Sequence, residues 1–318
     1  MTVSAEAWPE LPYERWKDTY ATLHLWTQVV GKIRLAQSPW LNHSWHVPLY
    51  VTARGLTTSS IPYGERVFDI AFDFIDHALL VRASDGLERR MPLRPRSVAD
   101  FYTEVMAMLE ELQLSVRIDR VPNEIADAIP FDEDTKHSAY APEYAQRFWR
   151  ILLQVDRIFS QFRTCFLGKC SPVHFFWGSF DLAVTRFSGR TAPRHPGGVP
   201  HLADAIVREA YSHEVSSAGF WPGGSGVEHP VFYSYAYQEP PGYRDTAVRP
   251  AAASFSSSLG EFLLPYDAVR TAPNPNATLL EFLQSTYEAA ANAAHWDRAA
   301  LECVSGKQGV PRAESKRA

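Results

Sequence analysis

Two long stretches of the chain carry hydrophobic side chains at the spacing of an α-helix. In residues 13–35, aromatic and aliphatic side chains recur every three or four positions, and residues 143–166 repeat that spacing. A Ser-Pro pair follows each stretch, at Ser38-Pro39 and Ser171-Pro172, and proline cannot continue a helix. The pattern therefore predicts two long helices, one in each half of the chain.

Shorter segments between and after these helices carry the signals of strands and of further helices. Strands are predicted at residues 45–57, 66–76, 78–83, 87–93, 174–187, 214–221, 231–238 and 260–265. Additional helices are predicted after Ser97, over residues 202–210, and after Asn276. Runs of hairpin strands beside long helices predict the α+β fold class.

The two halves show the same order of elements: a long helix, a Ser-Pro turn, strands and a closing helix. A shift of 133 residues pairs Trp16 with Trp149 and pairs the two Ser-Pro turns without a gap. We interpret this order as an internal duplication, with chance identity as the alternative. The sheets of the two units are expected to join in one compact body. The expected parts are a first unit at 1–120, an acidic connector at 121–142, a second unit at 143–303 and a disordered tail at 304–318.

Composition and charge narrow the classes of partner. A chain of 318 residues with 46% hydrophobic content can bury a large core. Its net charge of -5 at pH 7 gives no general positive field, so neither nucleic acid nor a membrane surface is expected as a partner. The first residues do not resemble a leader peptide, and the sequence contains no apolar run near the ~20 residues that a membrane-spanning helix needs. Both observations favour a cytoplasmic location. The three cysteines fit reduced thiols.

One predicted strand combines an apolar face with a face of mixed polar side chains. Because successive side chains in a strand point to opposite sides, Trp177, Ser179, Asp181 and Thr185 share the polar face. The apolar face should pack under the helices, which leaves the polar face as a pocket wall. The 133-residue shift places His46 and Tyr50 on the equivalent face of the first half. A polar, aromatic-walled cleft between the halves is therefore predicted.

His46 and Asp181 are the titratable groups of this cleft and are predicted to be its catalytic pair. Asp181 would hold or polarise His46 as a general base, which would raise the pKa of the histidine and lower the pKa of the carboxyl. The predicted ligand-binding residues are Tyr50, Trp177, Ser179, Thr185 and His213. In the structural alternative, Asp181 bonds to backbone or to an arginine, and His46 caps a strand.

A metal site can also be drawn from His43, His46 and His174, since the first two lie three apart and the third begins the matching strand. No helix carries a His-Glu-x-x-His pattern, so scattered structural histidines are favoured and no metal is predicted. The chain has no phosphate-binding loop, no dinucleotide fingerprint and no nucleophile elbow. The sequence therefore indicates no particular cofactor.

Residues 171–190, SPVHFFWGSFDLAVTRFSGR, resemble the central block of an uncharacterised bacterial family, the domain of unknown function 5996. Further blocks at Trp8-Pro9-Glu10-Leu11-Pro12, Ser44 to Leu49, Glu214 to Gly223 and Leu264-Pro265-Tyr266 are similar to the same family, so the resemblance spans roughly residues 8–301. The resemblance implies one shared architecture. It transfers no catalytic residue.

The expectation from the sequence is a cytoplasmic protein that binds a small molecule, or an enzyme, with its cleft between two related halves. The rival expectation is a non-catalytic interaction module whose exposed aromatic residues contact a protein partner. An enclosed polar cleft would favour the first, and a flat apolar patch without a cleft the second. The sequence leaves the substrate, the reaction and the oligomeric state open.

Overall fold

Two six-stranded antiparallel sheets, with helices packed beside them, form the computed structural model, which describes residues 7–224, 226–307 and 309–310. The helices are α1 (Tyr13–Gln37), η1 (Asn42–Ser44), α2 (Val98–Glu111), α3 (Pro142–Arg163), α4 (Asp204–Ala210), α5 (Tyr266–Arg270), α6 (Pro275–Ala293) and α7 (Arg298–Leu301). The first sheet contains β1 (Tyr50–Val51), β2 (Gly55–Thr57), β3 (Ile61–Tyr63), β4 (Arg66–Asp73), β5 (Ala78–Ala83) and β6 (Glu88–Pro92). The second contains β7 (His174–Phe176), β8 (Asp181–Thr191), β9 (His213–Trp221), β10 (Val231–Tyr237), β11 (Ser254–Ser256) and β12 (Glu261–Pro265).

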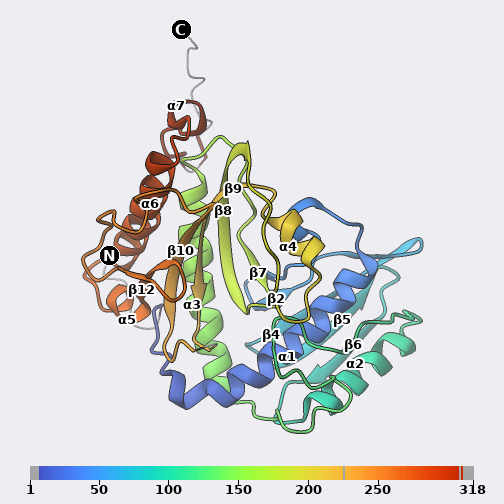
Figure 1. Cartoon of the computed structure of the whole chain (residues 1–318). Helices are drawn as coiled ribbons and strands as arrows, with labels where there is room; N and C mark the ends of the chain where they lie inside the picture. The colour runs from blue at the N-terminus through green and yellow to red at the C-terminus, as the bar shows by residue number, and fades with distance from the viewer. Residues whose placement is uncertain (1–6, 225, 308, 311–318) are drawn as a thin grey trace.

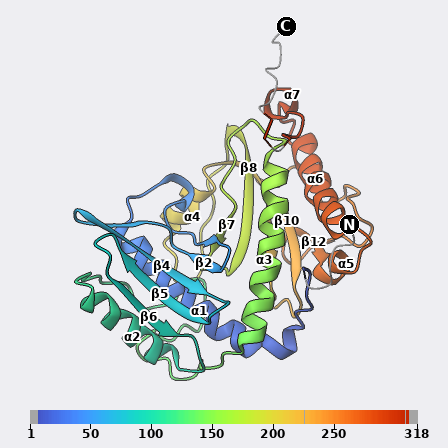
Figure 2. The ribbon, with the colours of Figure 1, turned by 180° about the vertical axis from the view of Figure 1, so that it is seen from behind.

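The second sheet has the strand order β11-β12-β10-β9-β8-β7, and its two faces differ in what covers them. Helices α3 and α6 pack on one face, whereas α4 lies on the opposite side, as the two views show (Figures 1 and 2). In the first sheet the order is β1-β2-β4-β5-β6, with β3 paired to β4, and α1 and α2 lie together beside it (Figure 1). The face of the second sheet away from α3 is the one that carries the site described below.

Local signals in the sequence explain several element ends. The backbone N–H of Asp100 donates to the Ser97 hydroxyl at 3.0 Å, so Ser97 is the N-cap of α2, as predicted. Asn274 caps α6 in the same way, accepting from the N–H of Ala277 at 3.1 Å. Ser38-Pro39 follows α1 directly, whereas α3 ends at Arg163, well before Ser171-Pro172, so proline marks the end of α1 and not of α3.

Backbone hydrogen bonds join the two sheets. Leu49, just before β1, and Phe175 in β7 exchange both of their N–H to carbonyl bonds, each at 2.8 Å. The indole N–H of Trp177 donates to the carbonyl of Val47 at 2.9 Å across the same junction. The chain is therefore one compact α+β body, which confirms the predicted fold class.

The internal duplication is not confirmed by the arrangement of elements. The 133-residue shift superimposes α1 on most of α3, but it then places α2 on β10 and β4 on the loop before α4. The shift does place β1 and β2 within β8, so some strand positions correspond as well. The positional argument from the first half to the second therefore holds for the two long helices and for these short strands, and it fails for α2 and β4.

Two predicted strands are hairpins instead. Residues 174–187 form β7 and β8, and a turn at Trp177–Phe180 separates them, with Phe180 in the left-handed region at φ 57°. Residues 45–57 form β1 and β2 after a short helical turn at η1. Neither turn carries the Asn-Gly or Asp-Gly pair that marks a tight hairpin. The alternation of side chains therefore predicted one continuous strand across each turn.

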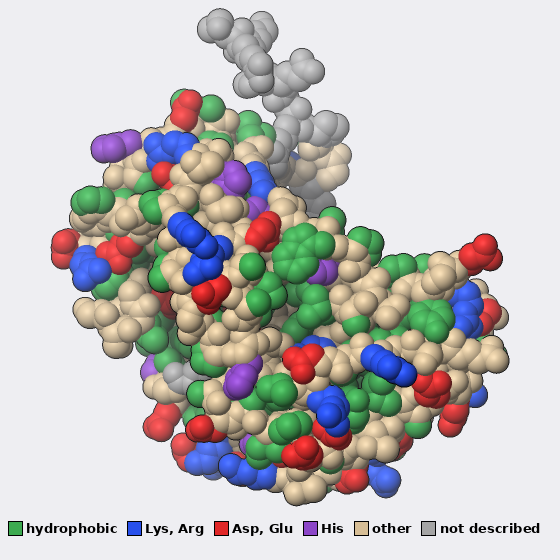
Figure 3. All heavy atoms as spheres, turned by 45° about the vertical axis from the view of Figure 1, so that its right-hand side comes forward, with side chains coloured by type: hydrophobic (Ala, Val, Ile, Leu, Met, Phe, Trp, Pro, Cys, Tyr) green, Lys and Arg blue, Asp and Glu red, His purple; other side chains and the backbone are tan. Residues whose placement is uncertain are grey.

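The remaining differences concern short elements. Strands β3 and β11 and helices α5 and α7 were not predicted. Of the predicted tail at 304–318, residues 308 and 311–318 lie outside the described residues. No helix in the described part of the chain is long and apolar enough to cross a membrane. Positive and negative side chains are interspersed on the face shown in Figure 3, with no large patch of one sign.

Candidate functional site

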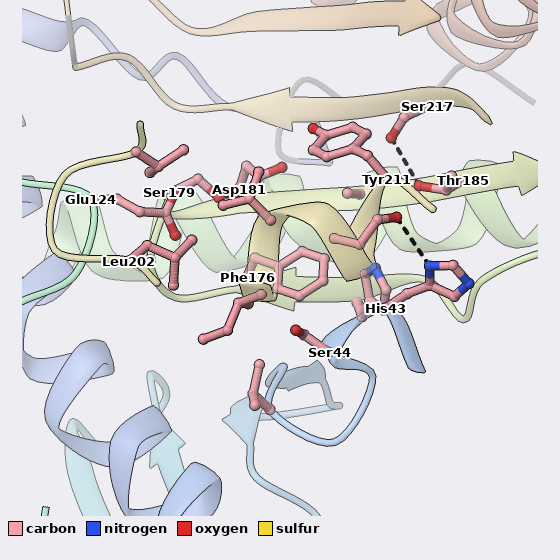
Figure 4. Close-up of a pocket in the computed structure, with 18 of the residues that line it drawn as sticks. His43, Ser44, Glu124, Phe176, Ser179, Asp181, Thr185, Leu202, Tyr211 and Ser217 are labelled. Carbon is pink, nitrogen blue, oxygen red and sulfur yellow. Dashed lines mark hydrogen bonds between the residues drawn. The ribbon is translucent and has the colours of Figure 1, made fainter. Parts of the chain in front are cut away.

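A cavity of about 380 Å³ lies against the second sheet, beneath α4 and beside the junction of the two sheets (Figure 4). Its walls come from the segment around η1, from residues 123–124, from β7 to β10, from β12, and from α4 with the loop before it. These segments are far apart in the sequence, and the fold brings them together. The volume is in the range of small-molecule sites.

The sheet supplies a wall of polar side chains. In an antiparallel pair, residues directly opposite each other point to the same face. Thr185 of β8 is opposite Ser217 of β9, which is opposite Tyr235 of β10. The Thr185 and Ser217 hydroxyls are hydrogen-bonded at 2.9 Å, so this row is already connected within the protein.

Asp181 lies at the end of this wall where β8 begins. The hydroxyl of Ser179 donates to one of its carboxyl oxygens and the hydroxyl of Tyr233 donates to the other. Burial raises the pKa of Asp181, and the two hydroxyl donors oppose that rise because they favour the charged form. A Cβ at Gly219 would lie 2.3 Å from the Tyr233 ring, so the glycine leaves the space that this tyrosine occupies.

Glu124 reaches the same end of the cavity from the segment predicted to be a connector. Its backbone is in the left-handed region at φ 62°, and its N–H donates to the carbonyl of Pro200 at 2.9 Å. The preceding peptide is clamped as well, because the Gln28 side chain bonds to both the N–H and the carbonyl of Asn123, at 2.8 and 2.9 Å. This tethering holds a conformation that costs energy in non-glycine residues, a feature often found at functional sites.

The Glu124 carboxyl packs directly over Gly178, where an added Cβ would lie 2.0 Å from one of its oxygens. Surrounding protein raises the pKa of Glu124 to about 7, and the nearby charge of Asp181 adds to the effect. Although it is enclosed by protein in this way, solvent still reaches the side chain through the cavity. A carboxyl with this pKa can both accept and donate a proton at neutral pH.

Glu261 of β12 is the third carboxyl of the wall. Burial raises its pKa to about 7 and the charge of Asp181 adds to that rise. Above it, the hydroxyls of Tyr211 and Tyr235 are hydrogen-bonded at 2.9 Å. Three carboxyl groups therefore share one cavity, and burial together with the charge of Asp181 leaves Glu124 and Glu261 partly protonated at neutral pH.

The opposite wall is apolar and includes the α4 cover. Its side chains are those of Leu35, Val47, Trp177, Val199, Leu202, Ile206 and Val207, and Phe176 adds an apolar ring beside Asp181 on the sheet side. His43 fastens the cover, since its backbone N–H donates to the Glu209 carboxylate at 2.7 Å and its Nδ1 is 3.0 Å from the Ala210 carbonyl (Figure 4). Lys169 reaches the other ring nitrogen of His43 at 2.6 Å, and burial lowers the pKa of His43.

Of the seven predicted site residues, Trp177, Ser179, Asp181 and Thr185 line the cavity, while His46, Tyr50 and His213 are not among its described lining residues. The Tyr50 ring lies under the Arg34 guanidinium, whose central carbon is 5.2 Å from the ring centroid. His213 begins β9, with its Nδ1 3.0 Å from the hydroxyl of Ser212. The alternation along β8 thus located one wall of the cavity.

The predicted pairing of His46 with Asp181 is wrong. Asp181 is bonded to Ser179 and Tyr233, whereas His46 accepts the N–H of Leu41 at 3.2 Å and packs on the Trp40 ring at 4.6 Å. Burial lowers the pKa of His46 and raises the pKa of Asp181, opposite to both expected directions. The reason is that residues 45–48 form a turn and irregular backbone and β1 begins only at Tyr50, so the strand alternation does not extend from residue 50 back to residue 46.

The three histidines of the drawn metal site have separate surroundings. His43 fastens α4, His46 faces Trp40, and His174 lies in the cavity wall with its ring 4.4 Å from Phe176. In the described part of the chain, no three His, Cys, Asp or Glu side chains are grouped as a metal ion would require.

Sequence reasoning missed five acidic or phenolic residues among those described as lining the cavity: Glu124, Tyr211, Tyr233, Tyr235 and Glu261. The alternation of tyrosines at 233, 235 and 237 was a usable signal, because it marks one face of a strand. Glu124 offered no such signal. Its position depends on a segment without regular structure that is fixed by side-chain bonds to α1.

A model of the family DUF5996, described as a family of unknown function, matches residues 8–303 of this chain. The match covers most of the 318 residues, so the chain belongs to that family. No curated protein and no solved structure matches the chain.

Proposed function

We propose that this DUF5996 protein binds a small organic molecule in the cavity beneath α4. One observation carries the proposal: a cavity of about 380 Å³ has one apolar wall and one wall of carboxyl and hydroxyl groups. Ligand sites combine an apolar lining with a few convergent polar groups in this way. The three cysteines are free, which supports a cytoplasmic location as part of the same proposal.

The construction of the cavity supports a site that is formed before the ligand arrives. Gln28 fixes the backbone beside Glu124, and two hydroxyl groups orient Asp181. Groups held in this way lose little freedom on binding, so more of the interaction energy appears as affinity. An interaction module would instead need a contiguous exposed apolar patch. Among the large exposed hydrophobic side chains, Trp40 and Leu41 are adjacent in the segment after α1, whereas Val67 lies in β4 and Leu167 in the segment after α3.

The proposal can be tested with N-phenyl-1-naphthylamine, an uncharged dye whose fluorescence rises in an apolar pocket. We expect saturable binding to the intact protein. Ala183 lines the cavity from near the start of β8, so Ala183→Leu should fill part of the space and weaken dye binding at least tenfold. Ala36→Leu adds the same group at an exposed position of α1 and serves as the matched control.

Two results would overturn the proposal. One is the absence of saturable dye binding by the wild-type protein. The other is equal binding by wild type and Ala183→Leu, with circular dichroism showing that both are folded. Loss of binding in Ala36→Leu as well would mean that the dye reports a general change in the protein and not the cavity.

A further inference from the structure

We infer that the molecule bound beneath α4 is an organic cation, a protonated amine carried on an apolar body. The inference rests on the proposed function and adds the chemical class of the ligand. It follows from the charges that face the cavity, from the hydrogen-bonding groups left unused there, and from the division of the walls into polar and apolar parts.

The charges that face the cavity have one sign. Glu124, Asp181 and Glu261 supply three carboxyl groups, and no Lys or Arg is among the described residues that line it. The two histidines of the lining add no positive charge at neutral pH, because burial lowers the pKa of His43 and lowers the pKa of His174 to about 3. A cation would be attracted by this wall and an anion repelled.

The hydrogen-bonding groups that remain unused are mainly acceptors. No side-chain hydrogen bond or ion pair to the carboxyls of Glu124 or Glu261 is formed by the described residues. Within the same lining, His174 is buried, and its Nδ1 has no hydrogen-bond partner among the described atoms. The hydroxyl of Ser44, which also lines the cavity, likewise has no partner among the described atoms, so the lining holds two further polar atoms whose hydrogen bonds are not made within the protein.

A protonated amine matches these groups in number and kind. Its N–H bonds can donate to carboxylate oxygens, forming charge-assisted hydrogen bonds, which are the stronger class. The ring of Tyr233 lies next to the carboxyl end of the cavity, and aromatic faces also attract ammonium groups. A quaternary ammonium lacks N–H bonds and would leave the acceptors unpaired.

The apolar wall receives the remainder of the ligand. Leu202 and Ile206, from α4 and the loop before it, line the cavity, and Phe176 lines it beside Asp181 on the neighbouring strand, so a hydrocarbon or aryl group would be buried against them. In Figure 4, Glu124, Ser179 and Asp181 lie together at one end of the group of side chains drawn. The ligand would therefore lie with its ammonium group at that end.

The pH dependence of binding follows from the same carboxyls. With pKa values raised to about 7, Glu124 and Glu261 are partly protonated at pH 7. A cation binds the ionised forms more strongly, so its binding should release protons and should strengthen from pH 6 to pH 8. A neutral ligand of the same shape should show neither effect.

The test uses three probes that share the same phenylalkyl group and differ in their polar end: 3-phenylpropylamine, 3-phenylpropan-1-ol and 3-phenylpropanoate. Each competes with the dye at pH 6, 7 and 8. We expect the amine to bind at least tenfold tighter than the alcohol at pH 8, the carboxylate to bind most weakly, and only the amine to gain affinity with pH. Titration calorimetry in phosphate and in Tris buffer measures the protons released.

Glu261→Gln and Asp181→Asn should each lower the ratio of amine to alcohol affinity at least fivefold. Glu65→Gln, an exposed carboxyl in the turn between β3 and β4, is the matched control and should leave that ratio unchanged. Equal competition by the amine and the alcohol, with dye binding still dependent on Ala183, would overturn the cation inference and leave the proposed function standing. Dye binding that ignores Ala183→Leu would overturn both.

Discussion

Gly31→Ala is expected to destabilise the protein even though alanine is the better helix former. Gly31 lies inside α1, where alanine alone would contribute about 1 kcal/mol of stability. An added Cβ, however, would lie 2.2 Å from two atoms of the Trp177 indole ring. Trp177 is buried and its N–H is bonded to Val47, so the ring cannot retreat without breaking the junction of the two sheets.

The magnitude follows from these opposing terms. Overpacking a core costs roughly 1–3 kcal/mol, and loss of the Trp177–Val47 hydrogen bond costs about 1 kcal/mol more. After the helix-propensity gain, the free energy of unfolding should fall by roughly 1–3 kcal/mol. Urea unfolding followed by far-ultraviolet circular dichroism measures the change without relying on the tryptophan signal.

A double-mutant cycle with Trp177→Leu tests the cause. If the clash with the ring is the source, Gly31→Ala should cost at least 1 kcal/mol less when Trp177 is already leucine, because the obstructing ring is gone. The reasoning is refuted if Gly31→Ala stabilises the wild-type protein. It is refuted equally if the two substitutions are additive.

Three further outcomes are expected. Ser97→Ala removes the cap of α2 and should lower the free energy of unfolding by about 1 kcal/mol, measured by urea unfolding; no change would refute the capping role. Burial lowers the pKa of His174 to about 3, so below pH about 6.5 the unfolded chain binds more protons than the folded one, and the free energy of unfolding decreases as the pH falls. Relative to His174→Phe, the wild type should lose about 1.4 kcal/mol of unfolding free energy per pH unit between pH 6 and pH 4. Arg186 is buried between the rings of Phe162 and Tyr287, with its guanidinium carbon 3.4 and 4.3 Å from the two ring centroids. Because a compact ammonium group cannot stack there, Arg186→Lys should be less stable than Arg186→Met. The reverse order of stability in thermal unfolding would contradict this reasoning.

The sequence predicted the elements whose signals are local. The two long helices, the Ser97 cap and strand β5 depend on spacing and on neighbouring residues, and they lie where predicted. The strand break at Trp177–Phe180 depends on packing of the turn against α1 and Glu124, which no local pattern reports. Extending one strand phase across that turn placed Phe175 with Asp181, whereas the register pairs Asp181 with Phe176.

The candidate site was predictable only on the strand where alternation holds. Asp181 and Thr185 could be assigned to one face from the sequence, because β8 runs without interruption between them. His46 could not, since its assignment used the 133-residue shift and the arrangement of strands differs between the halves. Glu124 and Glu261 come to the cavity through long-range contacts, so their raised pKa values have no signature in the sequence.

The cavity walls extend in the sequence from Leu35 to Glu261, and this separation has a kinetic consequence. During synthesis, the first wall has left the ribosome long before β12 can complete the second sheet. The pocket is therefore complete only after β12 has joined the second sheet, and we expect the folding transition state to contain little of it. A bound ligand should then slow unfolding while leaving the rate of folding almost unchanged, so it would prolong the lifetime of the native protein without helping the chain reach it.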